Sequence, residues 1–405
     1  MNQELQKRFA EVSLHVPEIL LPAPELSLAQ FAVIACDQHS AEPAYWEETK
    51  RIAGDAPSAL HLMLPEAWLG IRETIEPEIP RTMKKYLEDG SLRSIGRGMV
   101  YVRREVGPGL VRHGLVTAID LEGYDWAPGN HNRIRATEAT VAERLPERIK
   151  IRNQACLEIP HVMVLLDDEE NAMSGLLEAR RETLPKLYDF ELMQGGGRIE
   201  GYFVQEESAL AAVAEVMEQL LASCEDGFLM AVGDGNHSLA AAKACWEMRK
   251  EELAAAGGDM SPEALAAEPL RYALVELVSV YDEGLSFHPI HRLIMHVDPA
   301  DIPEMVRELG LDEEHLDLQK LQPALDLWMA EYRKTHPEVE LEYIHGREEC
   351  LQLGHTPGCY PIVFDRFERG AFFKTVLANG TFVRKSFSLG EAREKRYYLE
   401  SRRIR

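Results

Sequence analysis

The chain has 405 residues, 45% of them hydrophobic and 28% charged, which is typical of a soluble globular protein with more than one core. Lys and Arg number 44 against 68 Asp and Glu, so the formal net charge is -24. A chain this acidic repels nucleic acid and anionic membranes unless a local basic patch intervenes, so we expect neither as a partner. There is no Cys-x-x-Cys pair, apolar signal core or long apolar run, and we therefore expect a cytoplasmic protein.

In chain order, the first third predicts short strands, interrupted helices and one hairpin. Residues 31–36 form an apolar strand that ends at Asp37, where substrate-binding residues and turn-forming aspartates both occur. Cys36 beside it suggests a nucleophile, but no base lies nearby in the sequence. Residues 60–64 favour a strand and residues 74–88 a helix.

The hairpin is predicted from two alternating segments, residues 99–106 and 110–121. Gly107, Pro108 and Gly109 separate them and supply the turn. This is the clearest strand signal in the chain.

The segment after the hairpin carries an acid and several arginines. Glu138 follows a predicted strand and precedes a helix, so it fits either a general base for a substrate hydroxyl or an acid placed well for the helix dipole. Arg144, Arg148 and Arg152 are four residues apart and would share one face of an unbroken helix, but Pro146 interrupts it. The alternative for these arginines is a solvated face paired with acids.

The most informative stretch is residues 228–243. Residues 228–232 form a short apolar run typical of a buried strand, and the residues from 239 onward favour a helix. A helix beginning after a sharp turn directs its N–H groups and positive dipole end at the turn, which suits an anion. Plain helix capping by Asn236 or Ser238 is the alternative. The turn consists of Gly233, Asp234, Gly235, Asn236, His237 and Ser238.

The last third predicts further alternating strands and helices, with a charged helix over residues 385–399. His291 and Arg292 lie on a predicted strand close to His288, and a guanidinium beside an imidazole suits a phosphate, although paired histidines are more often structural. Residues 253–269 are rich in Ala, Gly and Pro, so we expect two domains, residues 1–255 and 270–405. Irregular alternation of strands and helices predicts an α+β fold with hairpins.

Several segments together resemble the bacterial and archaeal family called domain of unknown function 1015. The resemblance covers nearly the whole chain in order. It rests on residues 33–38 (VIACDQ), 42–46 (EPAYW), 135–138 (RATE), 144–148 (RLPER), 158–161 (EIPH), 233–237 (GDGNH), 289–292 (PIHR), 385–391 (KSFSLGE) and 395–398 (KRYY).

That family is similar in turn to the ParB and sulfiredoxin superfamily, whose members include nucleotide-binding partition proteins and kinases of free serine. The resemblance implies a ParB/sulfiredoxin-like core with an additional C-terminal lobe. It also implies that Asp234, Asn236 and His237, with Gly233 and Gly235, bind phosphates of ATP or ADP, with Asp234 holding Mg²⁺. Glu138 is the implied base, and a small hydroxylated metabolite such as serine is the implied acceptor.

The chain departs from the family pattern at Ser238, where an arginine is usual. A hydroxyl donates only one hydrogen bond, so Arg135, Arg148 or Arg292 would have to supply the positive charge. The departure also favours a second hypothesis, a nucleotide-bound regulator without turnover. DNA binding is disfavoured by the net charge and the lack of a basic helix-turn-helix pattern. A sulfiredoxin-like reductase would need a cysteine within the motif.

Overall fold

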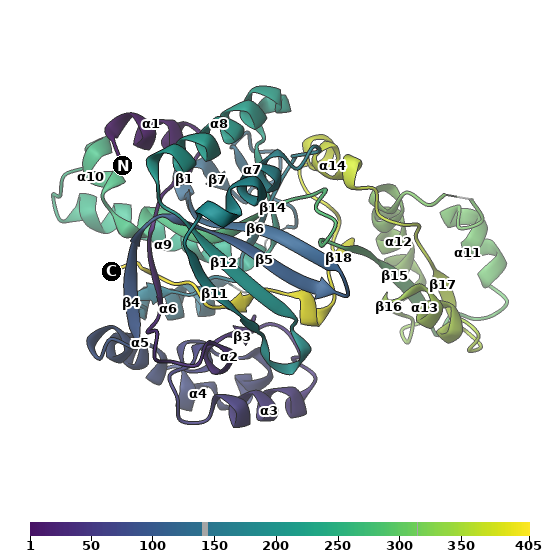
Figure 1. Ribbon diagram of the computed structural model, residues 1–405. Helices are drawn as coiled ribbons and strands as arrows, with labels where there is room; N and C mark the ends of the chain where they lie inside the picture. Colours follow the sequence, from purple (N-terminus) through teal and green to yellow (C-terminus); the bar gives the residue numbers. More distant parts are fainter. Residues whose placement is uncertain (140–144, 314) are drawn as a thin grey trace. The chain divides into compact units, whose positions relative to one another are not determined.

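The computed structural model describes residues 1–139, 145–313 and 315–405. Two compact units make up the chain. Unit 1 comprises Met1–Leu285 and Glu391–Arg405, and unit 2 comprises Ser286–Gly390. Both units mix helices with mainly antiparallel strands, so the fold is α+β, as the sequence predicts (Figure 1).

A ten-stranded sheet forms the centre of unit 1, and it contains the predicted hairpin of β5 (Met99–Gly107) and β6 (Leu110–Asp120). Most neighbouring strands are antiparallel, but β10 runs parallel to β14, and β13, β8 and β7 run parallel to one another. The order is β11-β12-β5-β6-β14-β10-β13-β8-β7, with β1 paired to β6. The remaining strands are β11 (Lys186–Glu191), β12 (Arg198–Val204), β14 (Tyr272–Ser279), β10 (Met163–Leu166), β13 (Met230–Asp234), β8 (Ile134–Ala136), β7 (Tyr124–Asp125) and β1 (Leu14–His15).

Helices cover this sheet, and its strands β14 and β10 are buried at every residue. In Figure 1, α1 (Gln3–Glu11), α7 (Ala172–Arg180) and α8 (Glu207–Ser223) lie on one side of the sheet. On the other side lie α2 (Leu28–Phe31), α3 (Pro43–Ala53), α4 (Arg72–Ile75) and α5 (Glu78–Glu88). The remaining helices of unit 1 are α6 (Leu145–Gln154), α9 (Asn236–Ala255) and α10 (Pro262–Ala266).

The end of the chain returns to unit 1 as an extended strap, so the helix predicted over residues 385–399 is wrong. β19 (Tyr397–Tyr398) pairs with β3 (Val33–Ile34), and β20 (Arg402–Arg403) pairs with β9 (Leu157–Glu158). Just before β19, the buried guanidinium of Arg396 binds the carboxylates of Glu276 and Glu400. These long-range contacts outweigh the local helix propensity of the tail. A further two-stranded sheet joins β2 (Glu18–Pro22) to β4 (Leu92–Arg97).

Unit 2 is built around the long strand β15 (Phe287–Met295), which pairs antiparallel with β16 (Glu340–His345), β17 (Tyr360–Ile362) and β18 (Phe387–Leu389). Its core includes the buried Ile294, Met305, Leu325 and Phe364. The helices are α11 (Ile302–Leu309), α12 (Leu318–Tyr332), α13 (Arg347–Leu353) and α14 (Phe372–Asn379).

Two predicted strands and the domain boundary also differ from the structure. Residues 60–64 mostly form a 3-10 turn, Ala59–Leu62, and residues 350–353 belong to α13, because short apolar runs do not distinguish strand from helix. The compact units divide at Leu285 and Gly390 instead of near residue 260, because β14 is a central strand of the sheet of unit 1.

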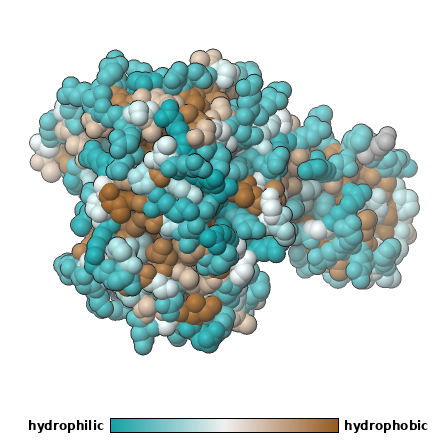
Figure 2. Space-filling model, viewed as in Figure 1, coloured by the Kyte–Doolittle hydropathy of each residue, from teal (hydrophilic) through white to brown (hydrophobic). Residues whose placement is uncertain are grey.

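The surface shown in Figure 2 is mainly hydrophilic, with small separate hydrophobic patches. Large hydrophobic side chains that are exposed, such as Leu69, Ile71 and Leu327, are scattered along the sequence. Single exposed hydrophobic residues of this kind are normal for a globular surface. Among the described helices, none has the length and apolar character that crossing a membrane requires.

Candidate functional site

The predicted turn joins β13 to α9. Gly233 is part of β13, and Gly235 is the N-cap residue of α9, with φ of +80°. A Cβ atom on Gly235 would lie 3.0 Å from Val162 Cγ2, so both the backbone conformation and the close approach require glycine there. Because the N-cap residue is glycine, its side chain provides no capping hydrogen bond to the first turn of α9. The helix therefore begins as the sequence predicts, with a positive dipole end at the turn.

Asn236 holds the turn to the neighbouring strand. Its side chain is buried; Oδ1 accepts a hydrogen bond from Thr137 N at 3.2 Å, and Nδ2 donates to Thr137 Oγ1 at 3.3 Å. These bonds fix the chain just after β8, so Glu138, the next residue, begins beside the turn. The Asn236 side chain therefore uses its hydrogen-bonding groups within the fold. The His237 side chain, in the same helical turn, is partly exposed.

Asp234 ends β13 and already has two partners. Its Oδ1 accepts the N–H of Gly235 at 2.9 Å, and its Oδ2 lies 2.9 Å from the ammonium of Lys395, which comes from the C-terminal strap. Within the described residues there is no cluster of three side chains suited to hold a metal ion. Lys395 takes the position of a cation beside Asp234, so these residues do not form a ready magnesium cage. Magnesium often arrives with the phosphates it binds and needs only one or two carboxylates from the protein.

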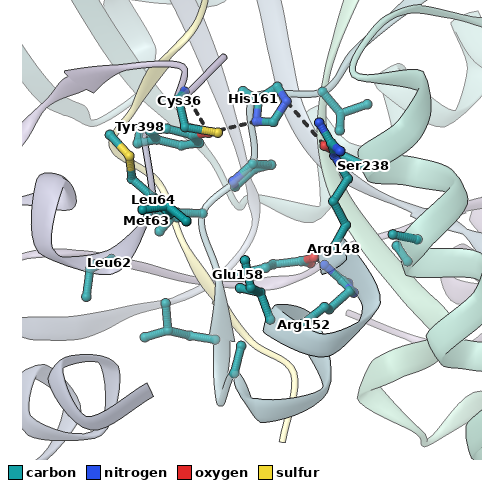
Figure 3. A pocket seen from close by; sticks show the side chains of 18 of the residues that line it. Cys36, Leu62, Met63, Leu64, Arg148, Arg152, Glu158, His161, Ser238 and Tyr398 are labelled. Carbon is teal, nitrogen blue, oxygen red and sulfur yellow. Dashed lines mark hydrogen bonds and ion pairs between the residues drawn. The ribbon is translucent and has the colours of Figure 1, made fainter. Parts of the chain in front are cut away.

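A chain of hydrogen bonds leads from the strap to α9 (Figure 3). The Cys36 N–H donates to Tyr398 Oη at 3.3 Å, Tyr398 Oη lies 2.8 Å from His161 Nδ1, and His161 Nε2 lies 3.3 Å from Ser238 Oγ. Burial raises the pKa of Tyr398 well above its ordinary value, so the phenol stays protonated.

The protonated phenol can act as a donor in this chain. Tyr398 Oη accepts from Cys36 and keeps its own proton, which can bond to His161 Nδ1. The His161 tautomer with its proton on Nε2 then donates to Ser238 Oγ. The Ser238 hydroxyl can in turn donate to a bound anion, so the chain delivers a hydrogen-bond donor rather than a base.

Two neighbours of this chain have shifted pKa values. Burial alone would raise the pKa of Asp37, but His161, the Gln38 amide and Lys395 together hold it below its ordinary value. Burial, together with the Asp37 charge, raises the pKa of the Cys36 thiol to about 12. Asp37 is therefore an ionised carboxylate at neutral pH, and Cys36 is not a thiolate nucleophile.

A cavity of about 620 Å³ in unit 1 opens beside this chain. Cys36, His161, Ser238 and Tyr398 line it, together with Arg148 from α6, which extends toward Ser238 in Figure 3. Arg148 also bonds to Glu66, at 3.2 Å, and its side chain is 34% exposed. Arg152 pairs with Glu158 deeper along the wall. The apolar part of the wall includes Leu62, Met63, Leu64, Leu157, Ile159, Leu239 and Ala242.

Two of the arginines predicted to bind phosphate have other partners. Arg135 is buried, donates to Asp226 at 2.7 Å and stacks over the Phe228 ring. Arg292 belongs to unit 2, where it is fully buried and donates to Gln322 Oε1 and to the carbonyls of Ile290, Lys385 and Arg384. Of Arg135, Arg148 and Arg292, the cavity is lined by Arg148 alone.

His291 and Arg144 complete the predicted set. His291 is buried in unit 2, where its Nδ1 accepts the Phe364 N–H at 3.1 Å; burial lowers its pKa, which keeps the ring neutral. Arg144 lies outside the described residues.

The site contains three residues that the sequence does not single out as functional: His161, Lys395 and Tyr398. Each lies in or near a short strand whose position is fixed by distant pairing, so periodicity gives no signal for these residues. A signal did exist, because His161 closes one segment of the family resemblance, and Lys395 and Tyr398 bound another.

Comparison with solved structures finds only distant likeness. A conserved hypothetical protein from Pyrococcus furiosus is 11% identical, with 68% of this chain and 90% of that chain covered and a TM-score of 0.30. A free serine kinase in complex with AMP is 9% identical, with 71% and 92% covered and a TM-score of 0.35. A mutant of a free serine kinase in complex with ADP gives the same four values. TM-scores in this range are too low to support an inference about a ligand.

No curated protein matches the chain in sequence. The profile of the family described as "Protein of unknown function (DUF1015)" matches residues 19–350, which is more than half of the chain. The chain therefore belongs to the DUF1015 family, as its sequence motifs predict.

Proposed function

We propose that the 620 Å³ cavity of unit 1 binds a nucleotide, ATP or ADP, and that the protein transfers or hydrolyses its phosphate. A small hydroxylated metabolite such as free serine is the proposed acceptor. The proposal rests on one observation: hydrogen-bond donors from three distant parts of the chain converge where the cavity meets the start of α9. They come from Arg148, from the N-terminal turn of α9, and from His161 through Ser238.

The cavity has the size and lining expected of a small-molecule site. Ligand pockets typically measure about 300–1,000 Å³ and are mainly apolar, with a few polar groups that orient the ligand. Here the apolar wall would receive a base or a ribose ring. The convergent donors at the turn would receive phosphate oxygens, because a helix N-terminus and a guanidinium both favour anions.

The chemistry we propose needs positioning and charge more than covalent catalysis. Glu138 would accept the proton of the acceptor hydroxyl as that oxygen bonds to the terminal phosphorus, and the bond to the leaving phosphate oxygen would break. His237, within the turn, would contact the phosphate, and Asp234 would orient the phosphate or hold Mg²⁺ that enters with the nucleotide. Asp37, ionised and close to His161, would bind the acceptor.

A regulator that binds nucleotide without turnover is the second candidate. It is favoured by Ser238, which stands where the family usually has an arginine and which can donate only one hydrogen bond to a phosphate. Removing a guanidinium from such a site weakens stabilisation of developing charge more than it weakens ground-state binding. The two candidates therefore predict the same ligand and differ in turnover.

A thermal-shift screen with ATP, ADP, CTP and pyrophosphate, each with and without Mg²⁺, tests ligand binding. A ligand that binds only the native state raises the melting temperature by mass action, by about 2.7 kcal/mol of stability at a hundredfold excess over Kd. We expect a nucleotide-specific rise that is lost in Asp234→Ala and retained in Arg51→Ala, an exposed surface variant. The absence of any rise at millimolar concentration would contradict the proposal.

Turnover is tested by following ADP or phosphate release with serine and other hydroxylated compounds as acceptors. We expect His237→Ala to lower turnover at least tenfold while the melting temperature of the protein alone is unchanged. Nucleotide binding without any product under these conditions would reject the enzyme and support the regulator.

A further inference from the structure

A second cavity in unit 1, of about 960 Å³, has a lining very different in charge from the rest of the chain. It lies among α1, β1, the end of β4, the segment from α10 to β14, and β20, and it shares no lining residue with the first cavity. Six basic side chains line it, namely Lys7, Arg97, Arg271, Arg402, Arg403 and Arg405. Three acidic ones line it, namely Glu18, Asp120 and Glu263.

Basic residues thus outnumber acidic ones by two to one around this cavity. In the whole chain the ratio is reversed, with 44 basic residues against 68 acidic ones. A concave surface of one sign within a protein of the opposite sign focuses the local potential. The three acidic side chains offset part of this positive charge, and the remaining excess of basic groups favours a bound anion.

Two of the arginines are fixed in place by acids. Arg271 donates to both oxygens of Asp120, at 3.0 Å and 2.7 Å. Arg402 is buried and pairs with Glu158 at 2.8 Å. Arg402 also donates to the carbonyls of Pro269 and Tyr272. These bonds hold both guanidinium groups in fixed positions in the wall of the cavity.

Two other arginines have no such partner. Arg97 and Arg403 are exposed, and the described part of the chain gives neither guanidinium a hydrogen bond or an ion pair. They extend from β4 and β20, two strands whose positions are fixed by pairing. Their charges are therefore available to a ligand, and the strands that carry them are rigid.

The imidazole of His15 also lines this cavity. Its ring stacks on Tyr272 with centroids 4.0 Å apart. Burial and the positive charges of Arg402, Arg97 and Arg271 lower the pKa of His15 to about 3. Burial is the main cause, and three guanidinium groups on three separate segments add to it in the same direction.

We propose that this cavity is a binding site for a small polyanion that carries two or more phosphate groups, and that the guanidinium groups of Arg97 and Arg403 bind its phosphate oxygens. A guanidinium binds phosphate oxygens through two parallel charge-assisted hydrogen bonds. The exposed Arg97 and Arg403 can each bind a phosphate in this way. Arg271 and Arg402 supply fixed positive charge in the wall. A neutral His15 can add one further donor. This site is separate from the proposed nucleotide cavity and does not depend on its function.

Isothermal titration calorimetry with inorganic tripolyphosphate, at constant ionic strength, tests the site. We expect Arg97→Gln/Arg403→Gln to weaken binding at least tenfold, because both residues are exposed and their loss leaves the fold intact. Arg133→Gln is the matched control: it removes one exposed arginine of unit 1 that lines neither cavity, and its affinity should stay within twofold of the wild type.

The first cavity also attracts phosphate in our proposal, so the variants must separate the two sites. Binding to the second cavity should persist in Arg148→Ala. Loss of binding in Arg148→Ala with full binding in Arg97→Gln/Arg403→Gln would assign tripolyphosphate to the first cavity and overturn the second site. Equal affinity in all variants, or no binding by the wild type, would overturn it as well.

A readout that does not depend on affinity is the titration of His15 by NMR. A bound polyanion opposes the positive field, so tripolyphosphate should raise the pKa of His15, and sulfate at the same ionic strength should not. An unchanged His15 titration at a tripolyphosphate concentration that saturates calorimetric binding would place the ligand elsewhere.

Discussion

Two regions of the molecule each contain a histidine and an arginine, but the structure uses the two pairs differently. In unit 1, His161 and Arg148 line a cavity, and the Arg148 side chain is 34% exposed. In unit 2, His291 and Arg292 are buried, and Arg292 is inaccessible to solvent. The Arg292 guanidinium donates to three backbone carbonyls and to Gln322, whereas Arg148 has Glu66 as a partner on one side and the cavity on the other.

The difference shows that residue type does not identify a phosphate site. What matters is whether the donors of a side chain are already used within the fold, because a guanidinium that satisfies buried carbonyls cannot leave them without a large desolvation cost. The contrast predicts that the two arginines respond to substitution in opposite ways, one through stability and the other through binding.

The largest effect is expected from Arg292→Ala. It would remove the donor of the buried Ile290 carbonyl and of the part-buried Lys385 and Arg384 carbonyls. A buried group left without a partner costs about 1–3 kcal/mol, so unit 2 should lose about 3 kcal/mol of unfolding free energy. Urea denaturation measures this loss. Nucleotide binding by unit 1, measured on the folded protein, should be unchanged. A variant that keeps its stability but loses nucleotide affinity would contradict the structural role of Arg292.

The next largest effect is expected from Arg148→Ala. A hydrogen bond to a charged group contributes about 1.5–3 kcal/mol, so nucleotide affinity should fall by about 10- to 100-fold in calorimetric titrations. Stability should change little, because the Arg148–Glu66 pair is partly exposed and such pairs contribute about 0–1 kcal/mol.

The matched control for Arg148 is Arg51→Ala. Arg51 pairs with Glu48 in a similar way, but on the exposed surface and away from the cavity. It should change neither affinity nor stability measurably. An equal loss of nucleotide affinity in both variants would mean that Arg148 acts only through overall charge.

A smaller effect is expected from Tyr398→Phe, which removes the hydroxyl that orients His161. The Cys36 N–H and His161 Nδ1 both lose a partner, so we expect about 1 kcal/mol of destabilisation and about a fivefold loss of nucleotide affinity. In wild-type protein, ¹⁵N NMR should show the His161 proton on Nε2.

Tyr397→Phe is the control for this pair, because the Tyr397 hydroxyl donates to the Met193 carbonyl and lies outside the chain to Ser238. It should destabilise the protein by a similar amount without lowering affinity. A His161 proton on Nδ1 would reverse the order of donors and make His161 a base instead.

The smallest effect on stability is expected from Asp37→Asn, and it shows as a weaker dependence of stability on acid pH. The folded-state pKa of Asp37 lies below its ordinary value of 3.8, so ionised Asp37 contributes stability that is complete above about pH 4. That contribution is lost as the pH falls through the folded-state pKa. Urea denaturation between pH 7 and pH 3 should therefore show that the unfolding free energy of the variant falls less steeply with acid than that of the wild type. Identical pH profiles would contradict the contribution assigned to ionised Asp37.

The same contrast explains how much the sequence predicts. The hairpin of β5 and β6 and the turn from β13 to α9 follow from local rules, since glycines mark the turns and hydrophobic periodicity marks the elements. The α+β class and the DUF1015 family follow as well. Of the site residues predicted from the sequence, Arg148 and Ser238 line the cavity.

What local rules miss depends on contacts between distant segments. The strap of residues 391–405 has helix-forming composition, yet β19 pairs with β3 across more than 360 residues. That pairing brings Tyr398 to Cys36 and His161, and Lys395 to Asp234. The burial of Arg292 likewise depends on carbonyls of residues 384 and 385, about 90 positions away, which no window around β15 contains.

The most direct measurement is a crystal structure of the protein with ADP. We predict phosphate oxygens within about 3 Å of Ser238 Oγ and of the Arg148 guanidinium, with the base against the apolar wall of the 620 Å³ cavity. ADP bound elsewhere, or a cavity that stays empty at saturating ADP, would contradict the assignment of this cavity as the nucleotide site.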